Sequence, residues 1–373
     1  MTGKEIDLLC IGNALVDVFA GAEAGANYGL TEPVQHIEIE KILEIISLCK
    51  SGGENPPVIC SGGGAANVAK VAACLGAKVN FLGAIGAGKT HETGVSSGPD
   101  EFGMLFESEL REAGVELNLP LKPAPTGICL YLGEGEEKRV AASPSAALEL
   151  SESDIKEDDI RRARILVLDG FILNKTGLVR HILELADKYG TIIAIDMGSA
   201  AIAGEHAAEI ADYARRYSLI LFMNEEEAAN FHKSAVSAST EGTGNREPSF
   251  ERIYSFFQSF SGKGPVTAVK RGGLGAICFA GGKSFLAETE AVFAQETTGA
   301  GDAFCAAFLY AYVRNKTPHF AATFPAHFAT KFPAHDFAEC AAFGNRAARL
   351  LLDSAGTKLD KEKMQSLAGI FAT

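Results

Sequence analysis

The sequence has no Cys-x-x-Cys pair and too few basic residues to balance its acidic ones, and each shortage excludes classes of protein. Its eight cysteines are scattered, which argues against structural zinc and a disulfide framework and fits reduced, mostly buried thiols. The 34 Lys and Arg residues stand against 47 Asp and Glu residues, and the net charge is −13. Because nucleic acids and anionic lipids select basic surfaces, we expect no nucleic-acid partner and no membrane partner.

Long apolar runs are also missing. No segment is an uninterrupted apolar stretch of membrane-spanning length, and residues 1–10 do not join a basic stretch to an apolar one. We therefore expect a cytoplasmic protein. With 47% hydrophobic and 22% charged residues over 373 positions, the composition is that of an ordinary globular protein. This length predicts one large domain with an accessory piece.

The most informative stretch lies at residues 296–302. Gly299 and Gly301 precede an apolar run, residues 303–313, that has helical length and composition. Glycines let successive N–H groups point outward, and a helix beginning at Asp302 adds unpaired amides and the positive end of its dipole. The pattern predicts an anion cradle in which Asp302 accepts the proton of an attacking hydroxyl. A plain helix N-cap at Asp302 is the alternative interpretation.

From residue 164 onward, strand-like and helix-like segments alternate, which is typical of βαβ units and a mostly parallel sheet. Ligands of such sheets bind beyond the carboxyl ends of the strands. The expected strands are residues 7–11, 79–85, 165–169, 191–196, 219–223, 266–270, 276–280 and 283–287, with a hairpin at 126–132 and 138–142. The expected helices are residues 39–49, 64–75, 101–113, 175–189, 206–216, 225–232, 250–260 and 336–352.

Two N-terminal motifs place polar groups at strand ends. Asp17 follows the strand at residues 7–11, so its carboxylate is a candidate for binding sugar hydroxyls, or it guards an edge strand. Three glycines at residues 62–64 precede a helix and let a ligand touch the backbone, and Asn67 offers a donor and an acceptor one turn later. A close crossing of strand and helix requires the same glycines.

Two further motifs follow later strands. Asn224 and Glu227 have the spacing of a helix-capping pair, and the same two side chains can reach the water shell of a Mg²⁺ ion. Residues 270–275 form a second glycine-rich turn at a strand end. This turn contacts phosphate or is a plain hairpin connection.

Two patterns point elsewhere. Residues 83–90 match the Walker A motif, with residues 165–169 as a Walker B strand, but the residues after Lys89 break helices. A P-loop NTPase is therefore an alternative. Residues 320–335 contain a tandem duplication with evenly spaced histidines, and its prolines prevent a continuous helix. We expect a surface insertion there rather than a metal site.

Taken in order, the motifs resemble the PfkB family of carbohydrate and nucleoside kinases along nearly the whole chain. The resemblance implies a ribokinase-like fold, a three-layer α/β/α sandwich with a mostly parallel central sheet and a small β-sheet lid. It implies ATP- and Mg²⁺-dependent phosphorylation of a primary hydroxyl on a small-molecule sugar or nucleoside, and leaves open a monovalent cation such as K⁺. The Gly12-Asn13 and Asp17 pattern is similar to the adenosine kinase-like branch, yet similar patterns occur in sugar kinases, so a sugar kinase is expected first and a nucleoside kinase is the alternative.

The resemblance also assigns roles to individual positions. It makes Asp302 the catalytic base and builds the anion hole from Gly299, Ala300 and Gly301. The implied substrate contacts are Asp17, Gly63, Gly64 and Asn67. The implied nucleotide contacts are Lys270, Gly272, Gly275, Thr298 and Asn345. The implied Mg²⁺ motif is Asn224 with Glu227.

One kinase domain over residues 1–373 is implied, with a lid from residues 14–38 and 126–142 that closes over the substrate and excludes water. Surface insertions are expected at residues 87–99 and 317–335. Glu296 stands where the family usually has Asp, and residues 195–199 lack the Arg of many members, which weakens a fructokinase assignment. A non-catalytic ligand-binding protein is a further alternative, and both monomer and homodimer remain open.

Overall fold

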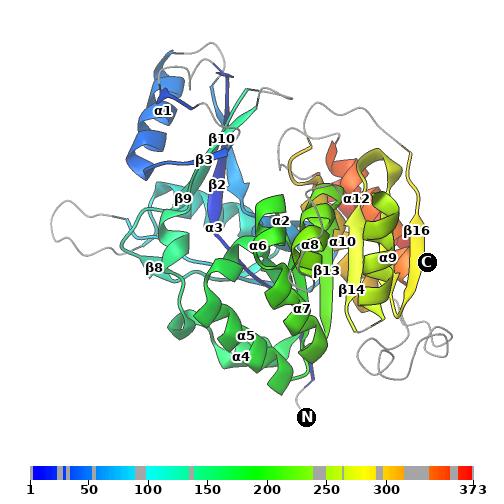
Figure 1. Ribbon diagram of the computed structural model, residues 1–373. Coiled ribbons are helices and arrows are strands. Elements are labelled where there is room, and N and C mark those ends of the chain that lie inside the picture. The colour runs from blue at the N-terminus through cyan, green and yellow to red at the C-terminus, as the bar shows by residue number, and fades with distance from the viewer. Residues whose placement is uncertain are drawn as a thin grey trace.

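The computed structural model describes residues 3–22, 28–30, 34–52, 56–88, 98–133, 138–237, 249–262, 264–290, 297–314, 336–352 and 360–371. A nine-stranded sheet forms the centre of the molecule, and a five-stranded sheet stands beside it with helix α1 (Ile39–Gly52) packed on it (Figure 1). The insertion at 317–335 and most of the one at 87–99 lie outside the described residues, as does Glu296.

The large sheet has the order β16-β15-β14-β13-β12-β11-β1-β5-β7. All neighbours from β14 to β7 are parallel, and β15 and β16 pair antiparallel at one edge. The strands are β1 (Ile6–Ile11), β5 (Val79–Leu82), β7 (Glu116–Asn118), β11 (Ala163–Asp169), β12 (Ile192–Asp196), β13 (Leu219–Asn224), β14 (Val266–Lys270), β15 (Ala276–Ala280) and β16 (Lys283–Ala287). The mostly parallel sheet expected from the alternation is confirmed.

The parallel strands are continuous apolar runs, and their side chains pack into two cores, one on each face of the large sheet. In β1, Leu8 and Cys10 join one core, whereas Leu9 and Ile11 join the other. The first face is covered by α2 (Gly64–Cys74), α3 (Glu101–Ala113), α10 (Ala300–Arg314), α12 (Phe337–Leu352) and α13 (Lys361–Phe371). The second is covered by α4 (Glu157–Arg162), α5 (Thr176–Lys188), α6 (Ala200–Glu205), α7 (Ala207–Arg216), α8 (Glu225–Ser237) and α9 (Phe250–Ser261).

The small sheet has the order β3-β10-β9-β2-β4. The expected hairpin is present, with β9 (Gly127–Leu132) antiparallel to β10 (Arg139–Ser143). The other strands are β2 (Leu15–Ala20), β3 (Val34–His36) and β4 (Val58–Gly62). Strand β4 was not expected, because its five residues follow two prolines and end in serine and glycine, which are typical of loops.

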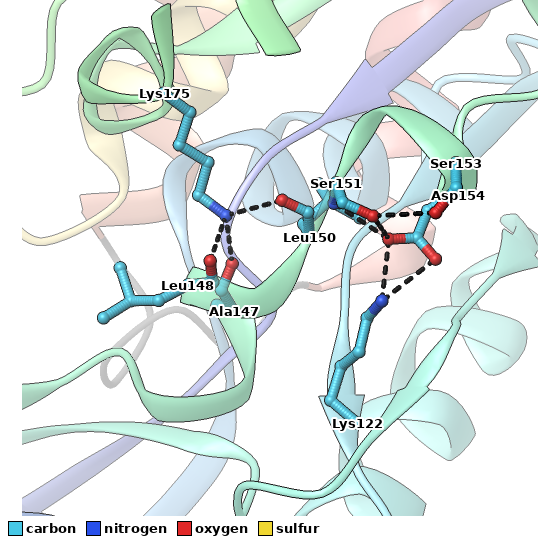
Figure 2. A network of polar contacts seen from close by, with 8 residues as sticks. All are labelled: Lys122, Ala147, Leu148, Leu150, Ser151, Ser153, Asp154 and Lys175. Carbon is cyan, nitrogen blue, oxygen red and sulfur yellow. Dashed lines mark hydrogen bonds and ion pairs between the residues drawn. The ribbon is translucent and has the colours of Figure 1, made fainter. Parts of the chain in front are cut away.

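The chain leaving β10 is anchored to the body of the molecule. It passes through two 3₁₀ turns, η3 (Ser145–Glu149) and η4 (Glu152–Asp154), before reaching α4. Figure 2 shows Lys175 donating to three backbone carbonyls of this segment, at 2.8, 2.8 and 3.1 Å. Lys122, in β8 (Leu121–Lys122), forms an ion pair of 2.7 Å with Asp154. The segment is thereby held from two sides.

Two expected boundaries are wrong. The strand expected at residues 79–85 is interrupted after Leu82, and β6 (Ile85–Gly86) pairs with β8 outside the large sheet. Helix α10 begins at Ala300 rather than at Asp302, because Gly299 adopts φ +83° and ends the preceding turn. None of the helices in the described part of the chain combines the length and the hydrophobicity needed to cross a lipid bilayer.

Candidate active site

The N-terminus of α10 has the backbone form of an anion cradle. The Ala300 N–H donates to the Thr297 carbonyl at 3.1 Å, and the Ala303 N–H donates to the Gly299 carbonyl at 2.9 Å. Helix geometry leaves the Gly301 and Asp302 amides without an acceptor inside the helix. These amides and the helix dipole together provide positive potential for an anion.

Asp302 is not the N-cap of α10, so the capping interpretation is wrong. It lies in the first turn, and its Oδ2 accepts a hydrogen bond of 2.8 Å from Nδ2 of Asn67 in α2. The Asp302 pKa is raised to about 7, mainly by burial and also by the neighbouring Asp196, while the Asn67 hydrogen bond and Lys270 act in the opposite direction. A carboxyl group with this pKa exchanges a proton readily near neutral pH.

The glycine loop at residues 62–64 brings further carboxylates to Asp302. A Cβ on Gly62 would lie 2.2 Å from the Asp17 carboxylate, so no larger residue fits there while Asp17 holds this position. A Cβ on Gly64 would lie 3.6 Å from Cβ of Asp169 and 3.7 Å from Oδ1 of Asp302. The glycine loop therefore lies close to three aspartates, Asp17, Asp169 and Asp302.

Asp17 is paired on both sides within the small sheet, so it does not guard an edge strand. Its strand β2 is antiparallel to β4 and parallel to β9. The side chain is buried, and burial raises the Asp17 pKa to about 7, while Lys70 and Lys138 act to lower it. The candidate site thus lies between the large sheet and the small sheet.

Two carboxylates of this region were missed by sequence reasoning. Asp169 ends β11, where it accepts backbone N–H groups from Asn13 at 2.9 Å and from Ile172 at 3.2 Å. Burial raises the Asp169 pKa to about 6. Asp196 ends the neighbouring strand β12. The signal was available, since both residues close apolar strands at the edge where parallel sheets bind ligands.

A buried lysine beneath the glycine loop was also missed. Lys70 in α2 is 5% exposed, and its ammonium donates to the Ser61 carbonyl at 2.7 Å and to Ser61 Oγ at 2.9 Å. The Ser61 N–H and hydroxyl in turn donate to Glu109 in α3, each at 2.7 Å. Burial lowers the Lys70 pKa, and nearby groups, Asp17 and Glu109 among them, counteract that effect. No sequence pattern marked this network.

A pocket of about 350 Å³ opens on the other side of the α10 N-terminus. The turn at residues 270–275 forms one wall and is also a hairpin connection between β14 and β15, so both interpretations of the turn apply to the same residues. Across the pocket, Asn345 in α12 donates to the Ala287 carbonyl at 2.8 Å. The lining includes six of the residues to which the resemblance gives a role: Lys270, Gly272, Gly275, Ala300, Gly301 and Asn345.

Lys270 joins this pocket to the anion cradle. Its Nζ lies 2.9 and 3.1 Å from the two carboxylate oxygens of Asp196. A Cβ on Gly301 would lie 3.1 Å from the same Nζ, so the ammonium is packed against the cradle. Burial acts to lower the Lys270 pKa, but Asp196, Cys305 and Glu227 together outweigh it, and the pKa is raised overall. Lys270 is therefore a cation at the pH of most assays.

The cradle is also contacted from the small sheet. Nζ of Lys138, the residue before β10, donates to Oγ1 of Thr298 at 2.8 Å. The same ammonium lies 4.7 Å from the ring centroid of Tyr131 and 5.8 Å from that of Phe19. This contact brings a third lysine, after Lys70 and Lys270, into the region between the two sheets.

Asn224 and Glu227 form a reciprocal capping box at the start of α8. The Glu227 N–H donates to Asn224 Oδ1 at 2.8 Å, and the Asn224 N–H and Nδ2 donate to the two Glu227 carboxylate oxygens at 2.8 and 3.0 Å. Glu227 is 4% exposed and Asn224 is exposed. The pair therefore fits contact with a metal through its bound waters, and does not fit direct ligation by Glu227. In the described part of the chain, no three His, Cys, Asp or Glu residues gather as a metal site.

Comparison with solved structures shows the fold. The adenosine kinase from Sinorhizobium meliloti is 20% identical with a TM-score of 0.75, covering 99% of this chain and 100% of that one. A probable sugar kinase from Rhizobium etli CFN 42 is 20% identical with a TM-score of 0.76, covering 98% and 99%. This is the ribokinase-like α/β fold.

Fold and relatives together define the class, a kinase that phosphorylates a hydroxyl of a sugar or nucleoside. The chain belongs to the pfkB family of carbohydrate kinases, whose model matches residues 57–364. The 5-dehydro-2-deoxygluconokinase of Bacillus licheniformis is 26% identical over 84% of this chain and 85% of that protein. Family membership implies the use of ATP. The P-loop alternative is wrong, since the chain belongs to the pfkB family. Within the motif, Ile85–Gly86 forms β6 and Ala87 bridges Pro99, whereas Lys89 and Thr90 lie outside the described residues.

Proposed function

We propose that this kinase transfers the γ-phosphoryl group of ATP to a primary hydroxyl of a sugar or nucleoside, with Asp302 as the base. The observation that carries the proposal is the 2.8 Å hydrogen bond from Asn67 to Asp302, beside the glycine loop and in the first turn of α10. It supports a role for Asp302 as an oriented carboxylate between the acceptor and the phosphoryl group.

The transfer forms a bond between the acceptor oxygen and the γ-phosphorus while the bond from that phosphorus to its bridging oxygen breaks. The hydroxyl proton passes to Asp302. Asn67 occupies Oδ2, so Oδ1, which faces Gly64, is the oxygen that takes the proton. Little covalent chemistry falls to the protein, and positioning with charge stabilisation supplies most of the rate.

Charge on the transferring group would be stabilised at the cradle formed by Gly299, Ala300 and Gly301. The amides at the start of α10 and the Lys270 ammonium converge there, as the contact of Lys270 with Gly301 indicates. The 350 Å³ pocket between the 270–275 turn and Asn345 would hold the nucleotide. Mg²⁺, which bridges and neutralises phosphate oxygens when bound, would be reached by Asn224 and Glu227 through water.

The small sheet would act as the lid over the acceptor. Asp17 in β2 would bind acceptor hydroxyls, and the Lys138 contact with Thr298 would bring the sheet to the phosphoryl side. Closure of this sheet would exclude water, which would otherwise compete with the acceptor for the phosphoryl group. Gly63 and Gly64 would let the acceptor approach the backbone.

The test is turnover by Asp302→Asn, measured as ADP release with adenosine, ribose, fructose, inosine and 5-dehydro-2-deoxygluconate as acceptors. The variant should lose roughly 10²- to 10⁴-fold in kcat and still bind ATP. Asp212→Asn, an exposed substitution on α7 that removes the same charge, is the control and should retain activity. Near-normal turnover by Asp302→Asn would show that the base is another group. Acceptor binding without any ADP release would favour the non-catalytic alternative.

A further inference from the structure

Lys270, at the end of β14, is held by a carboxylate two strands away. Its Nζ lies 2.9 and 3.1 Å from the two oxygens of Asp196, which ends β12. Strand β13 lies between these two strands in the large sheet, so the lysine side chain has to extend past the end of β13 to reach its partner. The ion pair therefore sets the direction in which this side chain points.

A thiol from α10 completes the contact. Sγ of Cys305 donates to Oδ2 of Asp196 at 3.1 Å, and the same sulfur lies 3.8 Å from Nζ of Lys270. Cys305 is fully buried, and burial raises its pKa, so the thiol keeps its proton and remains a donor. Because Cys305 follows Asp302 by three residues, both lie on the same face of α10. Asp196 is thus bound from β14 and from α10 at once.

The lysine ammonium lies against the anion cradle. A Cβ on Gly301 would be 3.1 Å from Nζ of Lys270, and both residues line the 350 Å³ pocket, which Asp196 does not line. A free lysine side chain has many rotamers, and a cation stabilises a transferring phosphoryl group best when its position is fixed before the reaction. The contact with Asp196 is one way to fix it.

Stability alone does not account for such a pair. The side chains of Lys270 and Asp196 are 16% and 12% exposed, and removing two charges from water can cost more free energy than their attraction returns. A second pair has the same burial, Lys122 with Asp154, whose side chains are 15% and 13% exposed (Figure 2). That pair binds η4 to β8 and does not line the pocket, so it is a matched reference for a purely structural role.

We propose that Asp196 and Cys305 are positioning residues of the phosphoryl transfer, and that together they hold the Lys270 ammonium against the anion cradle, where it meets the phosphates of ATP. Asp196 orients the ammonium through the ion pair, and Cys305 fixes the Asp196 carboxylate through its thiol. The inference rests on the proposed function and deepens it, because it adds two residues that act through Lys270.

A double-mutant cycle in the full chain separates positioning from a structural role. Asp196→Asn, Lys270→Met and the double variant are compared with the unchanged chain by kcat/KM for ATP and by calorimetric ATP binding without acceptor. Each kcat/KM is read from the plateau above the acid limb, so that shifts in the Asp302 pKa do not enter. Asp196→Asn should lower kcat/KM at least about 10-fold and weaken ATP binding at least about 5-fold, but change either less than about 2-fold in the Lys270→Met background.

Two substitutions test Cys305. Cys305→Ser keeps a donor for Asp196, so kcat/KM should stay within about 3-fold of the unchanged chain. Cys305→Ala removes the donor and should lower kcat/KM roughly 5-fold, with no loss in the Lys270→Met background. Equal losses from both substitutions would overturn the role of Cys305. The same two variants carry the test of the whole arrangement if thermal unfolding shows that Asp196→Asn does not fold.

Asp154→Asn is the matched control, because it breaks an equally buried ion pair. Whatever its own effect, it should change kcat/KM by the same factor with and without Lys270→Met, since the two sites share no partner. A loss from Asp196→Asn that is equal in both backgrounds, or below about 2-fold, would overturn the inference and leave the kinase assignment intact. Without ADP release from any acceptor, the proposed function is contradicted, and the cycle on ATP binding decides the inference. Failure of the unchanged chain to bind ATP would overturn both.

Discussion

We expect the ionised carboxylate of Asp302, the proposed base, to destabilise the folded state. Replacing it with a neutral group should therefore stabilise the protein while removing most of the turnover. The perturbation is Asp302→Asn. The new amide oxygen can still accept the 2.8 Å hydrogen bond from Asn67, so the local geometry is retained while the charge is lost. If the Asp302 carboxylate stabilised the folded state instead, the same substitution would lower the free energy of unfolding.

The magnitude follows from the pKa of Asp302, which is raised from 3.8 to about 7 by burial. A carboxyl group that binds its proton more tightly in the folded than in the unfolded state makes folding less favourable as the pH rises between those two values. At ~1.4 kcal/mol for each pH unit, the ionised Asp302 costs at most about 4 kcal/mol above pH 7, and relaxation of the site lowers this to roughly 2 to 4 kcal/mol.

The assay is thermal unfolding of both proteins from pH 4 to pH 8. At pH 8, Asp302→Asn should unfold roughly 3 to 5 °C higher for a chain of this size. The difference should shrink as the pH falls, because the wild-type carboxyl is then protonated in the folded state as well. A variant that is no more stable at pH 8, or a difference that does not change with pH, would refute the reasoning.

Three further predictions follow from the same contacts. Gly62→Ala places a Cβ 2.2 Å from the Asp17 carboxylate, and steady-state kinetics should show the acceptor KM rising at least about 10-fold with little change in the ATP KM. Asn67→Ala removes a bond that stabilises the ionised base, so the acid limb of kcat/KM should move up from near pH 7 by roughly one pH unit; a downward shift would contradict this. Lys270→Met removes the cation packed on the cradle, and the ATP KM should rise at least about 10-fold while acceptor binding, measured without nucleotide, stays unchanged.

Most of the fold could be predicted from the sequence because its signals are local. The parallel strands are continuous apolar runs with helix-forming segments between them, and Glu101–Ala113, Ala276–Ala280 and Lys283–Ala287 were expected with their observed bounds. Strand β4 was missed because its residues favour loops and become a strand only by pairing with β2.

The candidate site could be predicted only where it lies on motifs. The glycine loop, Asn67 and Asp302 belong to patterns with fixed spacing, and the structure brings them together. Asp169 is marked only by its place at the end of an apolar strand, and Lys70 has no pattern at all, since its partners depend on which strand and helix become neighbours in three dimensions. The start of α10 was misplaced by two residues, because only the backbone angle of Gly299 decides where the helix begins.

The segment that runs from β10 through η3 and η4 restrains movement of the small sheet relative to the large sheet. Lys175 and Lys122 bind this segment, so its end is held in place near α5. If the small sheet moves as a lid, this attachment would favour rotation over sliding. The movement would also have to be accommodated at Gly63, between β4 and α2, whose φ of +94° is a conformation that glycine adopts readily.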